Sequence, residues 1–215
     1  QLLRGRPIPP ERMELVAEHY EEVGGRSPLN ERTFAQAAAL EAQLRSAGLA
    51  VPVVVGMRNW RPYIADELRG LSERGLRRIV GVILSAHRSE ASIGSYMAAV
   101  RDGQAALGDG APQIVYAPGW HTSAGFIDAN ARNVAVELAK LPAAERTETP
   151  IIFTAHSIPT AMADQSTYVS DIGASAEGVA RVLGHERWAV AYQSRSGAPG
   201  QPWLEPDIKD ALVSA

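Results

Sequence analysis

The chain has 215 residues, of which 46% are hydrophobic, and its 21 basic and 24 acidic side chains give a formal net charge of −3. This composition is typical of a folded globular protein with one large core or two modest ones. The absence of a long basic run argues against binding to nucleic acid or to an anionic membrane surface. Because the sequence has no cysteine, it excludes disulfides, thiolate nucleophiles and cysteine-ligated zinc or iron–sulfur sites within this chain.

The sequence also has no candidate membrane span, since no window approaches the roughly 20 consecutive apolar residues that a transmembrane helix needs. The first residues, QLLRGRPIPPERM, lack the apolar core of a signal peptide. We therefore expect a cytoplasmic protein. Because the chain begins with Gln1 rather than Met, we also expect a processed or truncated N-terminus.

The spacing of apolar residues predicts two helices at the start of the chain, over residues 11–25 and 30–48. The second has Asn30 as its N-cap and ends at Gly48. Strands and helices alternate after that. We predict strands over residues 51–57, 77–86, 112–118, 150–155 and 188–194, and helices over residues 61–75, 89–107, 123–141 and 168–184.

This alternation predicts the fold class. Short β-rich apolar runs between amphipathic helices are typical of parallel sheets covered on both faces by helices, so we expect an α/β fold. The segment Gly-Asp-Gly-Ala-Pro, residues 108–112, indicates a boundary between two similar α/β domains. We place these domains at residues 1–114 and 115–215.

Polar side chains follow each predicted strand, where open α/β sheets bind their ligands. His87, His121 and His156 all lie at such positions. Any one of them could simply satisfy loop backbone or cap a helix, but together they favour a common crevice. The other residues at these strand ends are Arg58, Asn59, Trp60, Ser89, Trp120, Gln193, Ser194 and Arg195.

The motifs that the sequence lacks narrow the chemistry. No glycine-rich dinucleotide or P-loop motif follows a strand, and there is no G-x-S-x-G nucleophile elbow. Histidine can take up a proton or bind a metal near neutral pH, and arginine and aromatic side chains suit a flat ligand that carries carboxylates. The residues therefore indicate an acid–base or metal-handling pocket without naming the reaction.

Segments along nearly the whole chain resemble the ferrochelatase family, in the same order as in that family. They are EHYEEVGGRSPLN, VVVGMRNWRPYIADEL, TAHSIP and AYQSRSGAPGQPWLEPDI. The combination of TAHSIP with QSRSG is most similar to the actinobacterial branch, whose members act on coproporphyrin III. The resemblance implies a lyase-type enzyme of haem biosynthesis that inserts ferrous iron into a porphyrin, coproporphyrin III or protoporphyrin IX. It implies no organic cofactor, no nucleic acid partner and no integral membrane segment.

The resemblance also implies a role for His156, which matches the histidine of the family motif [ST]AH[SG]xP. In the family this histidine faces the bent macrocycle and accepts pyrrole protons or hands in the metal. A porphyrin loses two N–H protons as the metal enters, so a base at the ring centre fits the chemistry. Pro159 is expected to hold the loop open so that the imidazole points out of the strand end.

Further positions match porphyrin contacts of the family: Ser27, Tyr96, Arg4, Arg6, Tyr20, Arg58 and Asn59. Arg4 and Arg6 correspond to a basic segment near the propionates, although Leu3 stands where some relatives have arginine. Tyr96 is also at helical spacing with the apolar residues around it, which suits a core position, and Arg58 could instead form a surface salt bridge. We expect Gln193, Ser194 and Arg195 to buttress a loop, Trp203 to pack between the domains, and Trp120 and His121 to be structural.

The resemblance implies that the family's first strand precedes residue 1. It also implies that the glutamate partnering the catalytic histidine, with further strands, follows residue 215. We therefore expect this chain to correspond to the middle of a ferrochelatase.

Two alternatives to a ferrochelatase enzyme stay open: a porphyrin- or haem-binding fragment without turnover, and a related chelatase acting on cobalt or nickel tetrapyrroles.

Overall fold

The structure is a computed structural model that describes residues 2–3, 6–7, 9–22, 24–196 and 200–215. It consists of two compact units, residues 1–67 and 68–215. Among the described residues, no helix is both long enough and apolar enough to cross a membrane.

The first unit is mainly helical. Strands β1 (Leu2–Leu3) and β2 (Arg6–Pro7) form a short antiparallel pair, followed by α1 (Pro10–Glu22) and α2 (Leu29–Ser46). The predicted N-cap of the second helix is wrong, because Pro28 occupies that position and Asn30 lies inside α2. The Asn30 amide instead donates a hydrogen bond to the carbonyl of Arg61 over 3.1 Å, which ties α2 to a distant loop.

The predicted strand over residues 51–57 does not form. In this segment only Met57 pairs, through a single parallel bridge to Tyr63, and helix α3 (Ile64–Glu73) begins directly afterwards. A strand needs a neighbour to accept and donate its ladder hydrogen bonds, so an apolar β-rich run alone is not sufficient. Val51 and Val54 remain 47% and 39% exposed.

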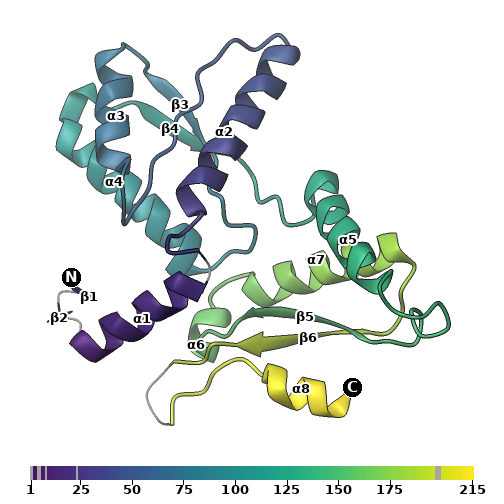
Figure 1. The fold of residues 1–215 in the computed structure, drawn as a ribbon. Helices are drawn as coiled ribbons and strands as arrows, with labels where there is room; N and C mark the ends of the chain where they lie inside the picture. The colour runs from purple at the N-terminus through teal and green to yellow at the C-terminus, as the bar shows by residue number, and fades with distance from the viewer. Residues whose placement is uncertain (1, 4–5, 8, 23, 197–199) are drawn as a thin grey trace. The chain divides into compact units, whose positions relative to one another are not determined.

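The second unit has the expected α/β alternation. After the end of α3 its elements are β3 (Arg78–Gly81), a π-helical turn (Glu90–Gly94), α4 (Ser95–Leu107), a 3-10 turn (Gly108–Gly110), β4 (Gln113–Tyr116), α5 (Ala124–Leu138), β5 (Ile151–His156), α6 (Thr160–Ala163), α7 (Tyr168–Leu183), β6 (Trp188–Gln193) and α8 (Ile208–Ser214). Strands β3 and β4 form one parallel pair and β5 and β6 another (Figure 1). Parallel strands flanked by helices confirm the predicted fold class. The boundary between residues 114 and 115 stays a prediction, and Ile114 lies inside β4.

The β3–β4 pair is shorter and more open than its sequence predicts. Strand β3 ends at Gly81, although the apolar run continues to Ala86. Val80 and Val115 stand opposite each other in the ladder and are 69% and 54% exposed.

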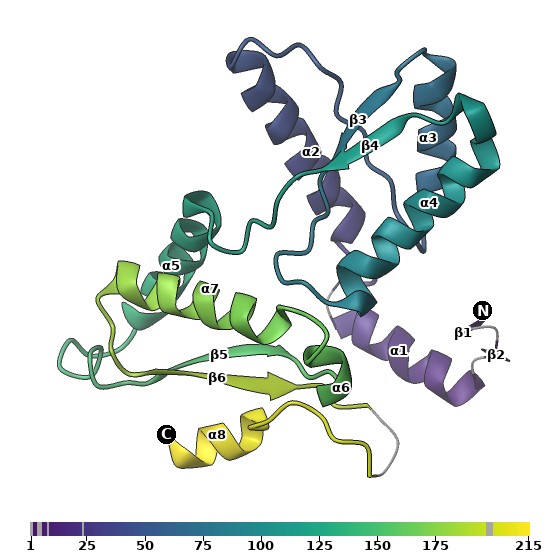
Figure 2. The same cartoon turned by 180° about the vertical axis from the view of Figure 1, so that it is seen from behind.

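Helices flank the β5–β6 pair on both sides. Helix α7 lies against one face and α8 against the other, as the two opposite views agree (Figure 1, Figure 2). The buried side of α7 carries Ile172, Ala176 and Val179 at helical spacing. Val179 forms the core with Ile127 and Ala131 of α5, which packs on the outside of α7. This packing fixes the carboxyl ends of β5 and β6 relative to the start of α7.

Candidate functional site

His156 is the last residue of β5, and its side chain is exposed at the carboxyl end of the strand. It stands opposite Gln193, the last residue of β6, in the parallel register. Thr154 and His156 are both exposed, as the two-residue alternation of a strand requires. The strand therefore presents the imidazole to solvent at the edge where α/β sheets bind their ligands.

The segment after His156 is held in place by hydrogen bonds. Ser157 is 2% exposed, and its hydroxyl donates to the carbonyl of Leu204 over 3.0 Å. The Leu204 N–H in turn donates to the carbonyl of Ile158 over 3.0 Å, and Pro159 bridges to Trp203. Helix α6 starts only after Pro159. The loop therefore leaves the strand on a fixed path before α6 begins.

Tyr168, the first residue of α7, contacts the same strand end. Its hydroxyl donates to the backbone carbonyl of His156 over 3.0 Å. Burial raises the pKa of the Tyr168 phenol, and the nearby phenol of Tyr192 raises it further. The hydroxyl therefore stays protonated, and so a hydrogen-bond donor, throughout the neutral range.

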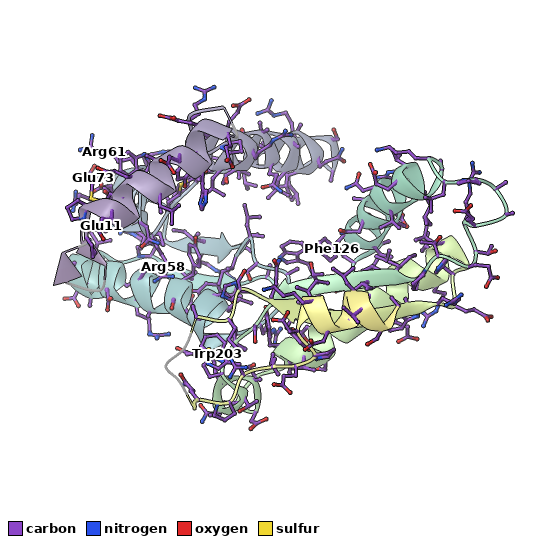
Figure 3. All side chains as sticks on the ribbon, turned by 60° about the horizontal axis from the view of Figure 1, so that its bottom comes forward. Glu11, Arg58, Arg61, Glu73, Phe126 and Trp203 are labelled. Atoms are coloured by element: carbon purple, nitrogen blue, oxygen red, sulfur yellow. The ribbon has the colours of Figure 1, made fainter. Side chains whose placement is uncertain are left out.

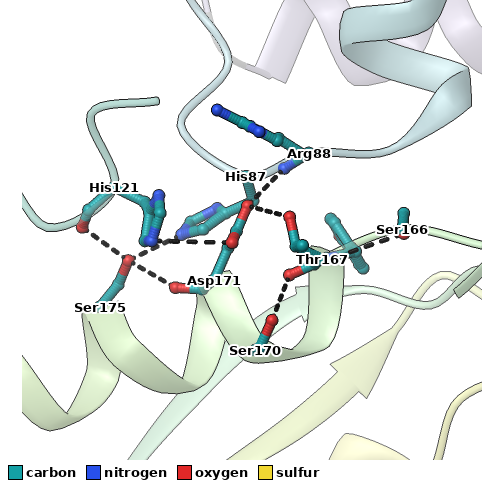
Figure 4. A network of polar contacts seen from close by, with 9 residues as sticks. His87, Arg88, His121, Ser166, Thr167, Ser170, Asp171 and Ser175 are labelled. Atoms are coloured by element: carbon teal, nitrogen blue, oxygen red, sulfur yellow. Dashed lines mark hydrogen bonds and ion pairs between the residues drawn. The ribbon is translucent and has the colours of Figure 1, made fainter. Parts of the chain in front are cut away.

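A second group of polar side chains lies between the loops after β3 and β4 and the first turns of α7 (Figure 4). This histidine cluster consists of His87, His121, Asp171 and Ser175. The Nε2 atom of His87 lies 2.9 Å from the Ser175 hydroxyl, and the Nε2 atom of His121 lies 3.6 Å from the Asp171 carboxylate. The imidazole centroids are 6.5 Å apart.

Asp171 is the hub of this cluster and is only 5% exposed. Its Oδ2 atom accepts hydrogen bonds from the backbone N–H of Arg88 over 3.0 Å and from the Thr167 hydroxyl over 3.1 Å. A buried carboxylate needs such donors, because desolvation otherwise penalises its charge. The cluster therefore clamps the strand-end loops to the beginning of α7.

Burial lowers the pKa of His87, and the neighbouring His121 side chain acts in the same direction, while the Asp171 carboxylate opposes both. His87 is consequently neutral at neutral pH. In the part of the chain that the structure describes, no three histidine, aspartate or glutamate side chains form a group able to hold a metal ion. The hydrogen bonds of the cluster account for its geometry.

Two tryptophans lie in these segments: Trp120 in the loop after β4, and Trp203 between β6 and α8, where it bridges to Pro159. The Trp120 indole N–H donates to the carbonyl of Ile83 over 3.0 Å, and its ring packs edge-on against Phe126 with centroids 5.1 Å apart. Both contacts support the structural role expected for Trp120. The indole nitrogen of Trp203 is buried without a hydrogen-bond partner among the described residues. Figure 3 labels Trp203 and Phe126, the α5 residue on which the Trp120 ring packs.

The predicted porphyrin contacts are distributed over both units. In the first unit Tyr20 is 44% exposed on α1, and the Ser27 hydroxyl accepts the N–H of Leu29 over 3.2 Å. Asn59 and Arg58 are also exposed, and Arg58 is labelled in Figure 3. In the second unit Tyr96 is half-buried in the first turn of α4. Their roles stay predictions.

The two arginines predicted near the propionates are not described at the level of their side chains. Arg4 lies outside the described residues. Arg6 belongs to β2, but its side chain also lies outside them. The propionate role of both residues stays a prediction.

Comparison with known proteins identifies the family. The family model for ferrochelatase matches residues 1–215. This chain belongs to the ferrochelatase family. It is 39% identical over 212 residues to a protein of Rhodopirellula baltica named ferrochelatase, with 99% of this chain and 60% of that protein covered.

Two actinobacterial proteins named coproporphyrin III ferrochelatase are similarly close. One, from a Mycobacterium species (strain KMS), is 40% identical over 214 residues, and one from Mycolicibacterium smegmatis is 39% identical over 212. They cover 98% and 97% of this chain, which in turn covers 62% of each of them. This chain thus spans about three fifths of the length of the curated relatives it matches.

Sequence reasoning missed Tyr168 and Asp171. Both lie in a predicted helix with no motif around them, and their partners are 12 and 83 residues away along the chain. A carboxylate on the buried face of an amphipathic helix is the one signal that could have identified Asp171, because a buried charge needs partners. No comparable signal marks Tyr168, whose ring suits a helix surface as well as a core.

Proposed function

We propose that this ferrochelatase-family chain takes part in the insertion of ferrous iron into a porphyrin, with coproporphyrin III as the substrate and coprohaem as the product. The observation that carries the proposal is the exposed imidazole of His156 at the carboxyl end of β5, within a motif that matches the family. The names of the mycobacterial relatives support the choice of coproporphyrin III.

The chemistry requires a base close to the ring centre. When the metal enters, two pyrrole N–H bonds break, two protons leave, and the ring nitrogens become ligands of the iron. Histidine exchanges protons between about pH 5 and 8, so it can accept a pyrrole proton and release it to water. His156 is the proton acceptor in this proposal and contacts the iron during its transfer. The iron is a substrate, and no organic cofactor takes part.

The porphyrin is held by burial of its faces and by pairing of its propionates. We assign ring contacts to Ser27, Tyr20, Tyr96 and Asn59, and propionate contacts to Arg4, Arg6 and Arg58. Arginine suits this task because its planar guanidinium can bind a carboxylate through two hydrogen bonds.

The test is an anaerobic titration of the chain with coproporphyrin III, followed by ferrous iron, with absorbance spectra recorded throughout. We expect the free-base bands to shift on mixing and to collapse to a metalloporphyrin spectrum faster than in a protein-free control. A shift without collapse would favour a porphyrin-binding fragment that lacks turnover. Faster insertion of cobalt or nickel than of iron would favour a related chelatase. No shift at all would contradict the proposal.

A further inference from the structure

We propose that Tyr168 is a positioning residue for His156, whose imidazole direction it sets by fixing the peptide plane between His156 and Ser157. The inference rests on the proposed function of His156. Tyr168 comes from a different element, the first turn of α7, and lies 12 residues further along the chain.

Both polar groups of this one peptide plane are engaged. The carbonyl of His156 accepts the Tyr168 hydroxyl over 3.0 Å, and the N–H of Ser157 donates to the carbonyl of Gln193 over 2.7 Å. Because the peptide unit is planar, these opposed bonds to α7 and β6 hold it as a rigid plate. Fixing this peptide plane fixes the ψ dihedral angle of His156, and with it the direction in which the side chain leaves the strand.

The exposed position of His156 makes this backbone restraint important. A buried side chain is oriented by its neighbours, as His87 is by Ser175, whereas the His156 ring projects toward solvent. The direction of its Cα–Cβ bond then determines where the imidazole can reach. A displacement of about 1 Å at a reacting group can reduce the rate on the order of 100-fold.

The tyrosine itself is anchored by the histidine cluster. The N–H of Asp171 donates to the carbonyl of Thr167, the residue before Tyr168, over 2.7 Å. The Asp171 carboxylate also accepts the Thr167 hydroxyl and the N–H of Arg88. The start of α7 is therefore fixed to the loop after β3, which holds the Tyr168 ring in its position beside His156.

The experiment replaces Tyr168 by phenylalanine in the full chain. This substitution removes the hydroxyl and keeps the ring. We expect kcat for iron insertion to fall by about tenfold, with KM and the Kd for coproporphyrin III changed by less than about twofold, because a positioning defect acts on the chemical step. Tyr192→Phe is the matched control, since it removes a neighbouring phenol from β6 and leaves the bond to His156 intact. We expect this control to keep the wild-type kcat.

A spectroscopic measurement tests the positioning without relying on turnover. With carbonyl-labelled and imidazole-labelled histidine, Tyr168→Phe should shift the His156 carbonyl ¹³C signal and broaden or shift its imidazole signals. Unchanged His156 signals, or a wild-type kcat in Tyr168→Phe, would overturn the inference. A wild-type chain that binds porphyrin but inserts no iron would overturn the proposed function instead, while the labelled signals would still decide whether Tyr168 orients His156.

Discussion

His156 and His87 lie in the same unit but in different environments. His156 ends a strand with its ring exposed, whereas His87 is partly buried and held by Ser175. An exposed imidazole can exchange protons with a ligand and with water, while a buried one exchanges them at a cost in stability. The environment of each histidine therefore leads to a different prediction.

Replacing His156 by alanine should abolish metal insertion and leave porphyrin binding within about tenfold of the wild-type Kd, because burial and propionate contacts hold the ring. The measurement pairs stopped-flow insertion kinetics with a fluorescence titration of the free-base porphyrin. Asn59→Ala, at an exposed predicted ring contact, should instead weaken binding more than it slows insertion. Turnover retained by the His156→Ala variant would refute the role assigned to His156.

His87 should make stability depend on pH. Its pKa is lowered in the folded protein from the ordinary value of 6.5 by burial, and His121 adds to this effect while Asp171 opposes it. The unfolded chain therefore takes up a proton first as the pH falls through 6.5. The contribution of His87 to the free energy of unfolding is fully present above pH 6.5. It is lost as the pH falls from 6.5 to the lowered pKa of the folded state, and no further loss occurs below that pKa.

Chemical denaturation between pH 8 and about pH 5 tests this prediction. The slope of the free energy of unfolding against pH that is due to His87 should correspond to the uptake of no more than about one proton on unfolding. His87→Gln should flatten the curve, because the amide keeps a polar partner for Ser175 and does not titrate in this range. His19→Gln, at an exposed position of α1, is the control and should keep the wild-type slope. Identical pH profiles for wild type and His87→Gln would contradict the assignment.

Among the elements, the contact between α5 and α7 depends on a glycine. A Cβ atom at Gly178 would lie 2.9 Å from Cδ1 and 3.4 Å from Cγ1 of Ile127, which is 7% exposed. At Gly173, on the same helix, a Cβ atom would meet nothing within 4 Å. The two positions share a helix and differ in their packing.

We expect Gly173→Ala to raise the free energy of unfolding by up to about 1 kcal/mol, because alanine favours the helix. Gly178→Ala gains the same helix preference but must displace Ile127, and overpacking costs roughly 1 to 3 kcal/mol. Its net effect should be destabilising by up to about 2 kcal/mol. Urea denaturation of both variants measures the difference. Equal stabilisation at the two sites would show that Ile127 repacks freely.

For the whole molecule, the preference between porphyrins should follow the number of propionates. We expect a four-propionate ring to bind at least about tenfold more tightly than a two-propionate ring, equivalent to roughly 1.4 kcal/mol. Competition titrations at moderate salt measure this ratio. Arg58→Gln should reduce it, whereas Arg61→Gln, at an exposed arginine nearby in the sequence (Figure 3), should leave it unchanged. Equal affinities of the wild-type chain for both rings would argue against coproporphyrin III.

Periodicity in the sequence was sufficient to predict the α/β class and most elements of the second unit, because spacing along the chain determines which faces are apolar. The TAHSIP motif singled out His156, whose role stays a prediction, and the structure places its exposed side chain at the end of β5. The sequence did not reveal that residues 51–57 lack a strand partner, since pairing depends on a distant neighbour. Nor did it reveal that Tyr168 and Asp171 meet the strand ends, because those hydrogen bonds join residues that only chain folding brings together.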